Sequence, residues 1–231
     1  MVSIVSHDLR SPLTTVSMAA SHLLEVPPTD GAWTKARPLL EMIKRGAGRM
    51  DRMIEDLLDV ARIESGGLAI ETSKVTVDSF MDEVATTLRP DVERHGQKLE
   101  CRVAAGLPAV CADRDRLLQV FSNLVGNAVK FTAAGGTVTV AADAHHRRVR
   151  FSVSDTGSGI TPENVPHLFD RFWQASRTDR RGMGLGLSIV KALVEAHGGH
   201  MAVASTPGHG TTFAFSVPVV GPPTRVGANR R

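Results

Sequence analysis

The stretch of sequence that decides the fold is Leu117-Leu-Gln-Val-Phe-Ser-Asn-Leu-Val-Gly-Asn-Ala-Val-Lys-Phe131. Its polar residues recur at helical spacing and share one face of the expected helix: Gln119, Asn123, Asn127 and Lys130. Apolar residues occupy the opposite, core-facing side: Leu117, Phe121, Leu124 and Ala128. An amide oxygen can ligate Mg²⁺ and a lysine can neutralise phosphate, so the polar face suits a magnesium–nucleotide complex. Taken alone, the pattern more often marks an ordinary amphipathic helix with a solvated polar face.

Two glycine-rich segments follow this helix. The first, Asp155-Thr-Gly157-Ser-Gly159, comes after an alternating, strand-like run from Val149 to Val153. A carboxylate can accept a hydrogen bond from the 6-amino group of adenine, which guanine lacks, and glycines let the backbone approach a base closely. The second, Gly182-Met-Gly184-Leu-Gly186-Leu187, precedes a helix whose first N–H groups can attract phosphate oxygens. Either segment alone could be a plain turn or a flexible loop.

The N-terminal part of the chain reads as a helical hairpin. Leucines and small apolar residues recur at spacings of four and three over about residues 2–25, and Pro12 predicts a kink. A second helix, from about Thr34 to Ser65, has an apolar face too broad for one neighbour, which predicts a homodimer that forms a four-helix bundle. His7 lies in the first helix, where a neutral imidazole nitrogen is nucleophilic near pH 7. By position alone it would be an ordinary surface histidine.

The rest of the chain predicts an α/β domain, and its composition narrows the function further. Alternating runs around Leu99, Val138, Phe151 and Phe215, with helices at about 78–95, 114–131 and 186–197, predict one mixed sheet covered on one face by helices. The net charge is only +3 and no dense basic block is present, which disfavours nucleic acid as a partner. No apolar run approaches the roughly 18 residues that span a bilayer. We therefore expect a cytoplasmic fragment, with any membrane anchoring supplied by an absent upstream input region.

Together, and in this order, these segments and Ser6-His7-Asp8-Leu9-Arg10-Ser11-Pro12-Leu13 resemble the transmitter core of a bacterial sensor histidine kinase, from about Ser3 to Val219. The resemblance implies an α-helical hairpin followed by an α/β sandwich of the gyrase and histidine-kinase ATPase type. Its implied domains are 1–66 for dimerisation and phosphoacceptance, a linker at 67–75, a catalytic ATP-binding domain at 76–220 and a disordered tail at 221–231. Its implied cofactors are ATP and Mg²⁺, and its implied partner is the receiver domain of a response regulator.

The resemblance also implies roles for individual residues. His7 would accept the phosphoryl group from ATP and pass it to an aspartate of the partner, and Asp8 would orient or deprotonate the imidazole. Asn127 would be the Mg²⁺ ligand. Asn123 stands where hydrolytic relatives carry a catalytic glutamate, and an amide cannot act as a general base for water. The remaining nucleotide-binding residues would be Lys130, Asp155, Gly157, Gly159, Phe169, Phe172, Arg180, Gly182, Gly184, Gly186, Leu187 and Thr212.

Some alternatives stay open at this point. Phe169-Asp170-Arg171-Phe172 resembles the phenylalanine box that anchors a mobile lid over the phosphates, yet its two aromatics could simply be core residues. Arg177, Arg180 and Arg181 are all candidates to reach the γ-phosphate. A catalytically inert scaffold and a gyrase-type hydrolytic ATPase are the rival functions. Relatives that also dephosphorylate their partner usually carry Thr or Asn where Ser11 stands, so phosphatase activity is in doubt.

Overall fold

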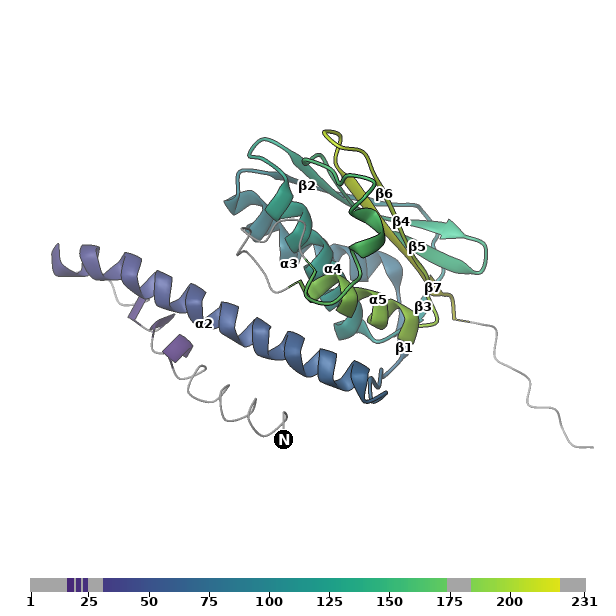
Figure 1. The fold of residues 1–231 in the computed structure, drawn as a ribbon, viewed down its shortest axis with the longest axis horizontal. Helices are drawn as coiled ribbons and strands as arrows, with labels where there is room; N and C mark the ends of the chain where they lie inside the picture. The colour runs from purple at the N-terminus through teal and green to yellow at the C-terminus, as the bar shows by residue number, and fades with distance from the viewer. Residues whose placement is uncertain (1–15, 19, 22, 25–30, 174–183, 221–231) are drawn as a thin grey trace, which may run out of the picture. The chain divides into compact units, whose positions relative to one another are not determined.

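The computed structural model describes residues 16–18, 20, 21, 23, 24, 31–173 and 184–220 (Figure 1). The chain divides into two compact units, Met1–Leu68 and Ala69–Arg231. Several predictions lie outside the described residues: those for His7, Asp8 and Ser11, the kink at Pro12, the three candidate arginines Arg177, Arg180 and Arg181, the glycine-box residue Gly182, and the tail 221–231. Among the helices that are described, none is both long and apolar enough to cross a membrane.

The first unit contains α2 (Gly31–Glu64), which begins slightly before its expected start. The helix is followed by a glycine pair: Gly66 has φ +67°, and the Gly67 N–H donates to Arg62 O at 2.9 Å. A glycine in this left-handed conformation is a common helix terminator. Ile43, Met50 and Leu57 recur one heptad apart on α2 and are each about half exposed. Among the described residues of α2, this stripe is an exposed part of the predicted apolar face.

The second unit is a five-stranded sheet with the order β2-β4-β5-β7-β6. In this sheet β2 and β4 run parallel to each other, and the other three neighbouring pairs are antiparallel. Helices α3, α4 and α5 pack on one face (Figure 1), so the predicted mixed sheet with one helical face is confirmed. The elements are β1 Ser73–Val75, α3 Val77–Arg94, β2 Lys98–Val103, β3 Val110–Ala112, α4 Arg114–Phe131, β4 Thr137–His145, β5 Arg148–Asp155, η1 Val165–His167, α5 Gly186–Ala196, β6 Met201–Ser205 and β7 Thr211–Pro218.

The core lies between the sheet and these helices. Four phenylalanines meet there, Phe80 from α3, Phe121 from α4, Phe151 from β5 and Phe215 from β7, and each is almost fully buried. Their ring centroids lie 5.3–6.5 Å apart, mostly in tilted or edge-to-face arrangements, which suit aromatic quadrupoles. The cluster fixes α4 against the two central strands and thereby sets which side of α4 remains free for a ligand.

A second, two-stranded sheet pairs β1 with β3 in antiparallel register. The segment 67–75, expected to be a linker, therefore contains a strand at its C-terminal end. Strand β3 also contacts the end of the domain: Val110 forms a bridge with Val219, and the Val220 N–H donates to Ala109 O at 2.9 Å. Strands β1, β3 and β6 were not predicted from the sequence.

Candidate functional site

The polar side of α4 forms one wall of the candidate site. Leu117, Phe121, Leu124 and Ala128 are buried, as their periodicity predicted. Asn123, Asn127 and Lys130 are only partly buried and lie on the other side of the helix. Asp113 caps the helix, because its carboxylate accepts a hydrogen bond from the Arg116 N–H at 3.1 Å. This cap and the phenylalanine cluster hold the three polar side chains in a defined orientation.

The start of α5 faces this wall at Asn123. A Cβ placed on Gly186 would lie 3.6 Å from Asn123 Oδ1, so the first residue of α5 and the amide are neighbours. The Asn123 Nδ2 atom is buried and has no hydrogen-bond partner in the described structure. A buried amide N–H without a partner carries a desolvation penalty that a ligand oxygen could relieve. The pair therefore forms a cradle suited to an anionic ligand at a helix N-terminus.

The second wall is built around Asp155, the last residue of β5. Its Oδ1 accepts hydrogen bonds from the Gly157 N–H at 2.8 Å and the Thr211 N–H at 3.3 Å. Burial raises the pKa of the Asp155 carboxyl, and these two hydrogen bonds only partly offset the rise. Because both bonds end on Oδ1, the second oxygen, Oδ2, is the one placed to meet a donor on a ligand.

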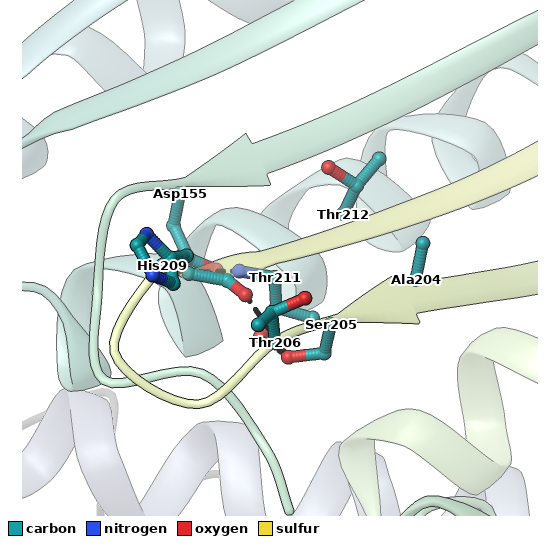
Figure 2. A pocket seen from close by; sticks show the side chains of 8 residues that line it. Asp155, Ala204, Ser205, Thr206, His209, Thr211 and Thr212 are labelled. Atoms are coloured by element: carbon teal, nitrogen blue, oxygen red, sulfur yellow. Dashed lines mark hydrogen bonds between the residues drawn. The ribbon is translucent and has the colours of Figure 1, made fainter. Parts of the chain in front are cut away.

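A pocket of about 180 Å³ opens beside Asp155. Figure 2 shows Asp155 at the end of β5 beside the loop that joins β6 to β7, with the other labelled side chains on that loop and on the adjoining ends of β6 and β7. Its lining is mostly polar and comprises Asp155, Ala204, Ser205, Thr206, His209, Gly210, Thr211 and Thr212. A small polar pocket with one partly buried carboxylate suits the hydrogen-bonding edge of a planar heterocycle.

Two glycines are required for the backbone to close around this carboxylate. A Cβ on Gly157 would collide with Phe131 O at the end of α4, where the Ser158 N–H donates to the same oxygen at 3.2 Å. A Cβ on Gly210, whose φ is +87°, would collide with Asp155 O. The loop after β5 and the loop before β7 thus approach Asp155 from two sides at backbone distance.

The two threonines that begin β7 lie on opposite faces of the sheet. Thr212 Oγ1 lies 2.9 Å from Ser154 Oγ, and this pair alternates with the buried Val153 and Phe213. Thr211 shares the helix-facing side with Asp155 and is bound to Ser205 Oγ at 2.9 Å. Thr212, the expected ligand residue, lines the pocket together with Thr211, whereas Ser205 was not expected from the sequence.

A backbone hydrogen bond joins the expected phenylalanine box to the second glycine-rich segment. The Phe172 N–H donates to Gly184 O at 2.9 Å, which brings the two sides of the segment 173–183 together. Phe172 has φ +62° and is 62% exposed, so it is not a core residue. Phe169 is partly buried, and Lys191 Nζ on α5 lies 5.7 Å from its ring centroid, within cation–π range.

The residues present fit a magnesium nucleotide. The unpartnered Asn123 amide and the bare Gly186 provide for phosphate oxygens, and Asn127 supplies an amide oxygen of the hard type that Mg²⁺ prefers. The partly buried Asp155 carboxylate suits an amino-substituted base. A helix-covered mixed sheet with this site defines an ATP-binding domain, here joined to a separate helical unit.

Comparison with known families agrees with this class. Residues 112–221 match the family described as histidine kinase-, DNA gyrase B- and HSP90-like ATPase. Residues 1–66 match the His Kinase A phospho-acceptor domain. The chain belongs to the sensor histidine kinases and forms their transmitter core.

Individual relatives cover nearly all of this chain. It is 39% identical over 216 residues to the sensor protein DivL of Caulobacter vibrioides, with 93% of this chain and 27% of DivL covered. It is 35% identical over 229 residues to the adaptive-response sensory kinase SasA of Trichormus variabilis, covering 95% of this chain and 57% of SasA. The crystal structure of full-length ShkA in complex with AMPPNP matches with a TM-score of 0.76 and 32% identity, covering 97% of this chain and 47% of ShkA. The chain thus spans less than three fifths of each of these relatives.

Proposed function

We propose that the chain transfers the γ-phosphoryl group of ATP to His7, and that His7 then passes it to an aspartate of a response-regulator receiver domain. In the first step a bond forms between an imidazole nitrogen of His7 and the γ-phosphorus. The bond from that phosphorus to the bridging oxygen of ADP breaks, and Asp8 takes or orients the imidazole proton. Catalysis of such a transfer is mostly positioning and charge neutralisation.

The observation that carries the proposal is the amide of Asn123, a residue of α4 that lies beside Gly186 at the start of α5. Its Nδ2 is buried without a partner and its Oδ1 lies beside Gly186, so it is placed to hold phosphate oxygens. An amide cannot remove a proton from water. The site therefore favours transfer to a nucleophile brought from elsewhere over hydrolysis of ATP.

The other side chains have separate tasks. Asp155 Oδ2 would accept from the adenine amino group, which selects ATP over GTP. Asn127 would hold Mg²⁺, and the ion would neutralise charge on the phosphates. Lys130, whose Nζ lies 4.7 Å from the Phe131 ring centroid, would stay near the end of α4 to meet the same charge. These tasks are binding and orientation, which leave the chemical step to the imidazole.

We also propose that the chain works as a homodimer, with its receiver-domain partner met in the cytoplasm. The half-exposed stripe of Ile43, Met50 and Leu57 has the heptad spacing that a second copy of α2 would cover. The family's phospho-acceptor domain gives the same expectation.

The test is incubation with γ-labelled ATP and Mg²⁺, comparing the unmodified chain with His7→Gln and with His22→Gln as a matched histidine control. Acid-labile, alkali-stable label that is lost only in His7→Gln is the expected result. Label that survives in His7→Gln would refute the assigned acceptor. Free phosphate without labelled protein would favour the hydrolytic ATPase, and nucleotide binding without either product would favour the scaffold.

A further inference from the structure

The start of α4 is the centre of a hydrogen-bonded junction. Asp113 Oδ1 accepts from the Arg116 N–H at 3.1 Å, which caps the helix. The other carboxylate oxygen, Oδ2, accepts from the Glu71 N–H at 2.9 Å. The N–H of Asp113 itself donates to His197 Nε2 at 3.0 Å. One residue therefore holds three separate segments of the chain through three different atoms.

His197 is fixed from both sides of its ring. It is 6% exposed and follows the last residue of α5. Its Nδ1 lies 2.7 Å from Leu193 O, in the last turn of that helix. A carbonyl oxygen can only accept, so Nδ1 carries the hydrogen, and Nε2 is left as the acceptor for the Asp113 N–H. His197 thus binds α5 to the start of α4 as a neutral imidazole.

The charge of Asp113 matches its two backbone donors. Although partial burial raises the pKa of this carboxyl, the hydrogen bonds from the Glu71 and Arg116 N–H groups, aided by the charge of the Arg116 side chain, lower the pKa below its usual value. At neutral pH it is therefore the ionised Asp113 carboxylate that accepts the hydrogen bonds from the Glu71 and Arg116 N–H groups. Both of its oxygens are used, which a neutral amide of the same shape could not reproduce.

The three segments that meet here matter to the site in different ways. Helix α4 carries Asn123 and Asn127, and α5 begins at Gly186. Glu71 lies on the segment that connects the end of α2, at Glu64, to β1. The junction therefore joins the path from the phospho-acceptor unit to both helices that would contact the phosphates.

We propose that Asp113 and His197 are positioning residues that couple the segment around Glu71 to the two nucleotide-binding helices. Nucleotide occupancy and the placement of this segment then bias each other, because a coupling free energy between two sites acts equally in both directions. The coupling rests on the proposed nucleotide site, which is tested separately by direct binding.

The test measures hydrogen exchange of the Glu71 amide in the full chain, with and without AMPPNP and Mg²⁺. A coupling of ordinary size should slow this exchange about fivefold or more when nucleotide is bound. The decisive variant is Asp113→Asn. Its Oδ1 still caps Arg116, at which asparagine is as good as aspartate, and its backbone N–H still reaches His197. Its amide nitrogen, however, cannot accept from Glu71.

We expect Asp113→Asn to bind AMPPNP and to melt cooperatively, yet to lose the nucleotide-dependent slowing at Glu71. Asp115→Asn makes the same charge change on a neighbouring exposed side chain and should keep it. Unchanged exchange at Glu71 in the unmodified chain, with binding demonstrated by calorimetry, would overturn the coupling alone. The same slowing in Asp113→Asn would also overturn it. Failure of AMPPNP to bind the unmodified chain would instead overturn the nucleotide site, and the coupling with it.

Discussion

Replacing Asp155 by asparagine should separate the fold from nucleotide recognition. The asparagine Oδ1 can still accept from the Gly157 and Thr211 N–H groups, which lie 2.8 and 3.3 Å from the aspartate oxygen. Its Nδ2, in place of Oδ2, would point N–H groups at the adenine amino group, which is itself a donor. A hydrogen bond to a charged acceptor contributes about 1.5–3 kcal/mol, so the Kd for ATP should rise roughly 10- to 150-fold.

The same substitution should leave the stability of the fold unchanged or increase it, although it weakens ATP binding. Burial raises the pKa of Asp155 in the folded protein above its unfolded value. A carboxyl with a raised folded pKa stabilises the fold only at low pH, and this contribution is lost as the pH rises through the folded pKa. At neutral pH the ionised carboxylate therefore costs stability, and asparagine removes that cost. Asp155→Asn should keep or raise the Tm at pH 7.

Calorimetric titration with AMPPNP and thermal melting measure the two quantities on the same sample. Asp82→Asn, an exposed aspartate on α3, is the matched control and should leave both unchanged. An unaltered Kd would refute the assignment of Asp155 to the base. A Tm several degrees lower would refute the claim that the second oxygen serves a ligand and not the fold.

Four further outcomes are expected. As the pH decreases, the ATP affinity of the unmodified chain should begin to fall at a higher pH than an ordinary aspartate would give, because the pKa of Asp155 is raised and its protonated carboxyl presents a donor. Binding titrations from pH 7 downward should show this pH dependence, and the Asp155→Asn variant should lack it. Gly210→Ala should lower the Tm and weaken ATP binding together, because its Cβ would collide with Asp155 O at positive φ. Phe151→Ala should lower the free energy of unfolding by about 3–5 kcal/mol in denaturant titration, because the side chain is fully buried. Met50→Asp should convert the dimer to a monomer, as measured by sedimentation velocity, whereas the control Glu64→Asp should remain a dimer.

Each of these outcomes can fail in its own way. A pH-independent affinity would mean that another group reads the base. Normal ATP binding by a well-folded Gly210→Ala would show that the loop can move aside without disturbing Asp155. A small loss for Phe151→Ala would indicate that the phenylalanine cluster collapses around the gap. A monomeric unmodified chain would refute the dimer outright.

The sequence was most informative where one local pattern determines the structure. Helix α4 was predicted to begin at residue 114 and end at 131 because its apolar positions repeat every three or four residues, and it does. Strands β5 and β7 were predicted from alternating apolar residues, since one face of each is buried against helices. Strands β1 and β3 have three residues each, too few to show a period, and they pair across the whole of α3 and β2.

The site shows the same limit. Asp155 and the amides of α4 lie in short segments whose residue types already suggest their chemistry. The contact between Asp113 and His197 joins residues 84 positions apart. The sequence around each of them contains no pattern that predicts this contact. Gln97 is a similar case: it is buried and its Nε2 donates to Val129 O and Thr132 O at the end of α4. Such long-range polar contacts depend on the finished packing, which no local pattern encodes.

Strand β3 has one more consequence. Its three residues pair with β1, where the chain arrives, and Val110 bridges to Val219, where the last strand has just ended. The two ends of the ATP-binding domain are therefore both hydrogen-bonded to the same short strand, β3. Domains whose ends lie close together tolerate circular permutation and insertion into other proteins. A permutant that joins Val220 to Ser73 through a short glycine linker and opens the chain at the exposed tip of the β4–β5 hairpin should retain the fold.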